Sequence, residues 1–162
     1  MNFAFIDNQN IVHGLKSLGW AMDWRRFRVH LRETWDVAVA YIFIGYVQGF
    51  ENMYRSLQEA GYVLIFKPTI PDPEGHVKGN IDAELVLQAM IDLPRYAKAI
   101  VISSDGDFAC LVRYLRGQGK LGAVLSPHVR TCSALLKKAA GPDIFFMDNL
   151  RKKLEYKRKG TA

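Results

Sequence analysis

The chain of 162 residues has the length of a single domain, and its content of 49% hydrophobic and 23% charged residues excludes an intrinsically disordered protein. Its longest apolar run, Val37–Ile44, is too short for a membrane helix, and its N-terminus lacks the basic start of a signal peptide. The formal net charge of +6 excludes an acidic protein and two isolated cysteines exclude a disulfide framework, so we expect a reduced, cytoplasmic protein without a membrane partner.

The predicted strands are short apolar runs, and the first of them, Asn2–Ile6, ends at the turn signal Asp7-Asn8. Strands that are apolar along nearly their whole length are typical of a parallel sheet covered on both faces. The run Ile144–Met147 is a candidate sixth strand at an edge of that sheet. The other predicted strands, in chain order, are Val37–Ile44, Tyr62–Phe66, Ala99–Ser103 and Leu121–Leu125.

Amphipathic helix patterns lie between these runs. Apolar stripes with helical spacing begin at Trp24, Phe50, Phe108 and Cys132. The segment Ile81–Leu93 is apolar nearly all round, which predicts a well-buried helix. The alternation of strands and helices predicts an α/β fold of three layers, α/β/α, with a central parallel sheet.

Acidic residues follow two of the predicted strands, at the carboxyl ends where folds of this class bind ligands. Asp7 follows the first strand, Asp105 and Asp107 follow the fourth, and Asp82 begins the helix after the long loop Lys67–Asn80. Converging carboxylates repel one another, and a divalent cation relieves that repulsion. Oxygen ligands without a histidine or cysteine cluster favour Mg²⁺ or Mn²⁺, which activate water for phosphodiester cleavage.

Three of these acids also have a structural interpretation. Asp7 suits a turn, Asp82 suits a helix N-terminus, and Asp107 is a natural N-cap for a helix that starts at Phe108. The glycine between Asp105 and Asp107 allows a turn that directs both acids to one point. Placement of all four acids after strands or at a helix start favours the metal site over four separate structural roles.

Three segments, Phe5–Asn10, Lys78–Asp82 and Ser103–Phe108, contain these acids, and Asp143–Asp148 spans the last predicted strand. The three segments resemble the signature blocks of NYN domains, and more narrowly those of the bacterial LabA/DUF88 branch of the PIN-like nucleases, and Asp143–Asp148 resembles the last strand of the family. The resemblance implies one domain over residues 1–150 and a parallel sheet in the order 3-2-1-4-5. Strands one and four are then neighbours at its centre.

The resemblance also implies metal-dependent cleavage of RNA. It implies that Asn10 orients a ligand or a substrate phosphate, and that Lys78 neutralises a phosphate or pairs with the carboxylates. Ser104 stands where the family usually has glycine, and its hydroxyl is a candidate contact for water or phosphate. The acidic set that the resemblance assigns to catalysis and metal binding is Asp7, Asp82, Asp105 and Asp107.

We therefore predict a Mg²⁺- or Mn²⁺-dependent endoribonuclease whose acidic cluster activates water against RNA, either single-stranded or structured. One alternative is a non-catalytic RNA-binding or regulatory module that keeps the fold. A second alternative is an Asp-x-Asp phosphohydrolase that acts on a small phosphate ester.

The last twelve residues, 151–162, form a basic tail that contains six of the 22 lysines and arginines and one glutamate. The rest of the chain has 16 basic and 15 acidic residues and is nearly neutral. Such a run is either a solvated helix end or an arm that attracts phosphate. The sequence leaves a homo-oligomer open, with this tail and the proline-rich loop Lys67–Asn80 as candidate contact surfaces.

Overall fold

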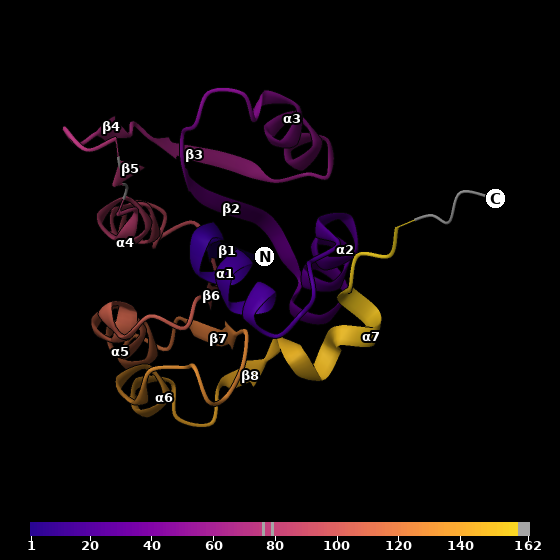
Figure 1. The fold of residues 1–162 in the computed structure, drawn as a ribbon. Coiled ribbons are helices and arrows are strands. Elements are labelled where there is room, and N and C mark those ends of the chain that lie inside the picture. The colour runs from indigo at the N-terminus through magenta and orange to yellow at the C-terminus, as the bar shows by residue number, and fades with distance from the viewer. Residues whose placement is uncertain (76, 79, 159–162) are drawn as a thin grey trace.

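A six-stranded parallel sheet forms the centre of the protein in the computed structural model, which describes residues 1–75, 77–78 and 80–158 (Figure 1). Its order is β3-β2-β1-β6-β7-β8. The predicted order 3-2-1-4-5 is thus confirmed, and the candidate sixth strand lies at the edge beyond the fifth. The strand bounds are β1 Asn2–Asp7, β2 Val37–Gly45, β3 Val63–Lys67, β6 Ala99–Ile102, β7 Leu121–Ser126 and β8 Ile144–Phe146.

Strand β1 is central, and it lies between β2 and β6 with Ile6 opposite Ile42 on one side and Ile102 on the other. The chain adds β2 and β3 to one side of β1 and then returns to add β6 to the other side. The carboxyl ends of β1 and β6 therefore meet where the strand order reverses, which is the usual ligand position in such sheets.

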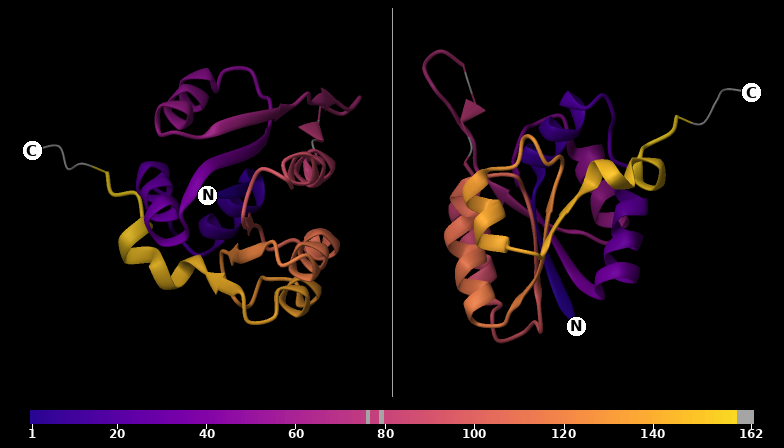
Figure 2. Two further views of the ribbon diagram at one scale, coloured as in Figure 1. Left: turned by 180° about the vertical axis from the view of Figure 1, so that it is seen from behind. Right: turned by 90° about the horizontal axis from the view of Figure 1, so that it is seen from below.

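Side chains of β1 alternate between two cores, one on each face of the sheet. Ala4 and Ile6 belong to the first core, whereas Phe3 and Phe5 belong to the second. The first core is covered by α1 Asn8–Ser17, α2 Trp24–Trp35, α3 Glu51–Glu59 and α7 Arg151–Leu154, and the second by α4 Asp82–Ile91, α5 Ala109–Gly117 and α6 Ala134–Ala140 (Figure 2). The predicted three-layer α/β/α fold is confirmed.

The predicted long loop between β3 and α4 contains a short antiparallel hairpin. Its strands are β4, Ile70–Pro71, and β5, Val77–Lys78, and it projects away from the three layers (Figure 2). Two short 3₁₀ helices complete the elements, η1 at Gly106–Phe108 and η2 at Met147–Leu150. Within the described part of the chain, no helix is both long and apolar enough to cross a membrane.

Two helix predictions differ from the structure. Helix α4 buries Leu85 and Ala89, but Leu87 and Ile91 on its other side are 61% and 58% exposed. The prediction of a helix buried all round is therefore wrong, because a helix in the outer layer has the sheet on one side only. The helix predicted from the apolar stripe at Cys132 begins later in the structure, because Ser133 is the N-cap of α6 and its side chain accepts a hydrogen bond there.

The first part of the basic tail packs against the domain. Leu154 of α7 is fully buried, and Glu155 forms a β-bridge with Met22. The backbone N–H of Tyr156 donates to the carbonyl of Ala21 at 2.8 Å. The lysines Lys152 and Lys153 remain exposed on α7.

Candidate metal centre

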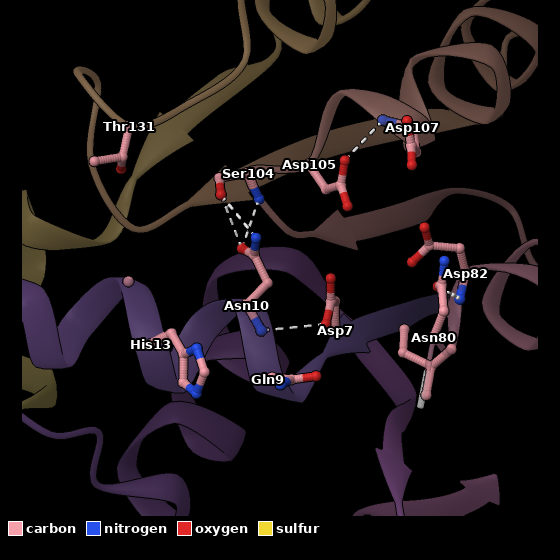
Figure 3. A pocket seen from close by; sticks show the side chains of 12 residues that line it. Asp7, Gln9, Asn10, His13, Asn80, Asp82, Ser104, Asp105, Asp107 and Thr131 are labelled. Atoms are coloured by element: carbon pink, nitrogen blue, oxygen red, sulfur yellow. Dashed lines mark hydrogen bonds between the residues drawn. The ribbon is translucent and has the colours of Figure 1, made fainter. Parts of the chain in front are cut away.

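Three carboxylates meet at the carboxyl end of the sheet, between β1 and β6. Asp7 ends β1, Asp105 follows β6, and Asp82 is the first residue of α4. Each offers one oxygen atom, and these three oxygens all lie within 4.8 Å of one another. Figure 3 shows the three side chains directed into one cavity of about 540 Å³, which Asp107 also lines.

Asp7 is held by the start of helix α1. Its side chain is the N-cap of that helix and accepts a hydrogen bond from the backbone N–H of Asn10 at 3.2 Å. The hydroxyl of the buried Ser103 donates to its other carboxylate oxygen at 3.1 Å. The same hydroxyl accepts from the backbone N–H of Asp105, so Ser103 ties the ends of β1 and β6 together.

The carboxyl group of Asp7 has an unusually high affinity for its proton. Only 6% of the residue is exposed, and this burial raises the pKa of Asp7 to about 6. The hydrogen bonds from Asn10 and Ser103 oppose the rise, whereas the negative charges of Asp82 and Asp105 add to it. A positive charge placed in the cavity would reverse this effect and keep Asp7 ionised.

Asn10 and Ser104 lock the turn after β6 onto helix α1. The backbone N–H of Ser104 donates to the Asn10 side-chain oxygen at 2.8 Å, and the Asn10 side-chain amide donates to the Ser104 hydroxyl at 2.8 Å (Figure 3). Two of the three predicted substrate contacts, Asn10 and Ser104, thus line the cavity, but their polar atoms bond to each other. In the structure, these two residues position the segment that leads to Asp105.

The turn that contains Asp105 and Asp107 depends on a close approach rather than on an unusual backbone angle. Asp105 is the N-cap of η1 and accepts from the backbone N–H of Asp107 at 2.9 Å. The predicted N-cap role therefore belongs to Asp105, and Asp107 lies inside η1. Gly106 does not have a positive φ, but a Cβ atom at this position would clash with the side chain of Ser133.

Asp82 enters the cavity from the first turn of α4. Its backbone N–H donates to the side chain of Asn80 at 2.8 Å. The ammonium group of Lys67 contacts the carbonyl oxygen of Asn80 and lies 3.5 Å from Glu84 on the same helix. Partial burial, followed by the charge of Asp105, raises the pKa of Asp82, and the charge of Lys67 opposes this rise.

The donor set of the cavity fits a hard divalent cation. Three carboxylate oxygens are close enough together to bind the same cation, and no cysteine or histidine belongs to this group among the described residues. Burial, and after it the neighbouring negative charges, raises the pKa of Asp7 and of Asp82, so a cation in the cavity would favour the ionised carboxylates. These residues are therefore suited to hold Mg²⁺ or Mn²⁺.

All four predicted acids line the same cavity, although Asp107 is exposed and lies outside the group of three close carboxylates. The side chain of Lys78 lies outside the part of the chain that the structure describes. Ser103, which joins Asp7 to Asp105, was missed because its position after an apolar run suggested only the end of a strand. The sequence interpretation also missed other residues that line the cavity, Gln9, His13, Asn80 and Thr131.

Comparison with known proteins agrees with this fold. The NYN domain family matches residues 3–145, and the chain belongs to this family, which is of the PIN-like nuclease type. The chain is 25% identical to "Low amplitude and bright protein LabA" of Synechococcus elongatus in an alignment over 124 residues that covers 70% of this chain and 67% of that protein. A crystal structure of a Vibrio parahaemolyticus protein of unknown function has the same fold, with a TM-score of 0.81 and 21% identity over 96% of this chain and 95% of that one.

Proposed function

We propose that the protein is an endoribonuclease that depends on Mg²⁺ or Mn²⁺ and cleaves phosphodiester bonds of RNA. The observation that supports this proposal most strongly is the meeting of the Asp7, Asp82 and Asp105 oxygens within 4.8 Å. Membership of the NYN domain family supports the nuclease class and RNA as the substrate. When bound, a divalent cation makes a water molecule more nucleophilic and stabilises the negative charge that develops on the phosphate.

Asp7, Asp82 and Asp105 hold the cation in this proposal, and Asp107 faces the same cavity from its rim. Asp7 is the most buried of these acids, so its hydrogen bonds from Asn10 and Ser103 fix the deepest ligand. The substrate phosphate enters beside the N-terminus of α1, where the helix dipole favours an anion.

The side chains of Asn10 and Ser104 act by positioning rather than by contact with the phosphate. Their mutual hydrogen bonds engage the side-chain oxygen of Asn10 and one N–H of its amide. The exposed side chain of His13 lies on the same wall of the cavity, one helical turn beyond Asn10, and reaches a bound strand more readily (Figure 3).

Cleavage of a labelled single-stranded RNA tests the proposal. The wild-type protein should cut it with Mn²⁺ and not with EDTA, and Asp105→Asn should abolish the cutting. Asp36→Asn is a matched control, because Asp36 lies just before β2, at the amino ends of the strands and away from the cavity, and its side chain is 82% exposed. Its backbone is left-handed, a conformation that asparagine adopts well. This control should cut like the wild type.

Two other results, from this experiment and from an assay with a small phosphate ester, would exclude the ribonuclease. RNA that is bound but not cut in the presence of Mn²⁺ would indicate a binding or regulatory module. Metal-dependent hydrolysis of a small phosphate ester that RNA does not inhibit would indicate a phosphohydrolase.

A further inference from the structure

A second cavity lies beside the metal centre, in the groove between α5 and α6. Its volume is about 710 Å³, and Arg113 and Arg116 of α5 line it together with Lys138 of α6. Arg113 lies one turn beyond Cys110 on the same face of α5, and Lys138 follows Leu135 in the same way on α6. Two neighbouring helices thus direct positive charge into one groove.

The cations of this groove have no acidic partners in the described part of the chain. None of the carboxylates there forms an ion pair with Arg113, Arg116 or Lys138, all of which are exposed. The guanidinium group of Arg116 lies against Gly141, just beyond the end of α6. A surface with three unpaired cations attracts an anion, and the planar arginine groups suit the paired oxygens of a phosphate.

The groove adjoins the cavity of the metal centre. Asp107 lines both cavities, and Gly106 next to it lines the groove. Both helices run away from the carboxyl edge of the sheet, so the groove leads from the metal centre along the side of the protein. Between the cations its surface is apolar, with Leu135 66% exposed.

We propose that this groove binds the sugar–phosphate backbone of a single-stranded RNA whose scissile phosphate lies at the metal centre, an inference that rests on the proposed function. Arg113, Arg116 and Lys138 bind successive phosphates on one side of the cleavage point. The exposed apolar surface at Leu135 receives a ribose or a base, because a single strand presents both.

The basic tail is the competing RNA-binding surface of this chain. Its lysines Lys152 and Lys153 are on α7, which covers the opposite face of the sheet from α5 and α6 (Figure 1). An RNA strand bound at the metal centre reaches the α5–α6 groove past Gly106 and Asp107, two residues that line this groove. The groove, rather than the tail, therefore provides the phosphate contacts.

RNA binding by paired charge variants tests this proposal. All proteins carry Asp105→Asn to prevent cleavage, and the anisotropy of a labelled oligouridine of about 16 nucleotides reports binding over a range of salt concentrations. The groove variant is Arg113→Gln/Lys138→Gln, and the control Lys152→Gln/Lys153→Gln removes the same charge from the tail. Arg113→Lys/Lys138→Arg keeps the charge of the groove.

Two lost phosphate contacts should reduce the slope of log affinity against log salt by about 1.4, because each contact with a single strand contributes roughly 0.7. At 0.1 M salt this corresponds to about 25-fold weaker binding of the groove variant. The tail control and the charge-keeping variant should bind like the parent protein. Thermal unfolding at an unchanged midpoint should accompany the loss in the groove variant.

Three results would overturn the groove assignment: an equal loss in the tail control, a larger loss in the tail control, or no binding of RNA by the parent protein. Cleavage is measured alongside, in the wild-type chain and in an Arg113→Gln/Lys138→Gln variant that keeps Asp105. Cleavage that does not depend on the groove refutes the groove and leaves the ribonuclease, whereas groove-dependent binding without any cleavage refutes the ribonuclease and leaves the groove.

Discussion

Replacement of Asp7 by asparagine should stabilise the metal-free protein at neutral pH. Asp7 is buried beside two other carboxylates, and its pKa is raised to about 6. An aspartate with a raised pKa in the folded state binds its proton more tightly there than in the unfolded chain. Its contribution to stability is therefore favourable below about pH 4 and is lost as the pH rises through 6.

The size of this loss follows from the pKa difference. A rise from 3.8 to about 6 corresponds to roughly 3 kcal/mol at pH 7 and above, at 1.36 kcal/mol for each pKa unit. Asparagine keeps the cap of α1 through its side-chain oxygen but disturbs the hydrogen bond from Ser103, at a cost of about 1 kcal/mol. The net gain is about 2 kcal/mol at pH 7.5, or roughly 4–8 °C in the unfolding midpoint.

Thermal unfolding of wild type and Asp7→Asn in EDTA at pH 4 and pH 7.5 measures this effect. The variant should be the more stable protein at pH 7.5 and no more stable than the wild type at pH 4. The exposed Asp36→Asn variant supplies the control for loss of a negative charge. A variant that is less stable than the wild type at pH 7.5 would show that the ionised Asp7 carboxylate does not destabilise the folded protein, and would refute the reasoning.

Three further predictions concern the same cavity. Saturating Mn²⁺, at about 100 times its Kd, should stabilise the wild type by about 2.7 kcal/mol in thermal unfolding and Asp105→Asn far less, and equal shifts in the two proteins would contradict the site. Gly106→Ala should lower the free energy of unfolding in denaturant by about 1–3 kcal/mol, because the added Cβ clashes with the side chain of Ser133. The second substitution Ser133→Gly should recover most of this stability, and a failure to do so would place the clash elsewhere. Asn10→Ala should cost about 2 kcal/mol and more than Ser104→Ala, since only the first leaves the Ser104 N–H unpartnered, and a reversed order in chemical denaturation would exclude the proposed clamp.

The order of the strands could be predicted, because apolar runs identify the strands and the family resemblance supplies their arrangement. Helix α1 could not be predicted with the same means. Its start has the sequence Asp7-Asn8, which is typical of a turn, and the same aspartate is the N-cap of a helix. Because the helix was missed, His13 was not placed one turn after Asn10 on the wall of the cavity.

All four predicted acids line one cavity, but their contacts depend on the fold. Ser103 joins Asp7 to Asp105 across 96 residues of sequence, and no local pattern indicates such a bond. The cationic groove likewise needs α5 and α6 side by side, because Arg113 and Lys138 come from different βα units. Local patterns identify elements and end-of-strand acids, whereas partners from distant segments appear only when the sheet is assembled.

The most direct test of the central claim is the location of the cation itself. Crystals soaked in Mn²⁺ should give an anomalous difference peak between Asp7, Asp82 and Asp105, at about 2.2 Å from their carboxylate oxygens. Crystals of Asp105→Asn treated in the same way should give a weak peak or none. A wild-type cavity without a peak, or a manganese ion bound only elsewhere on the protein, would contradict the metal centre.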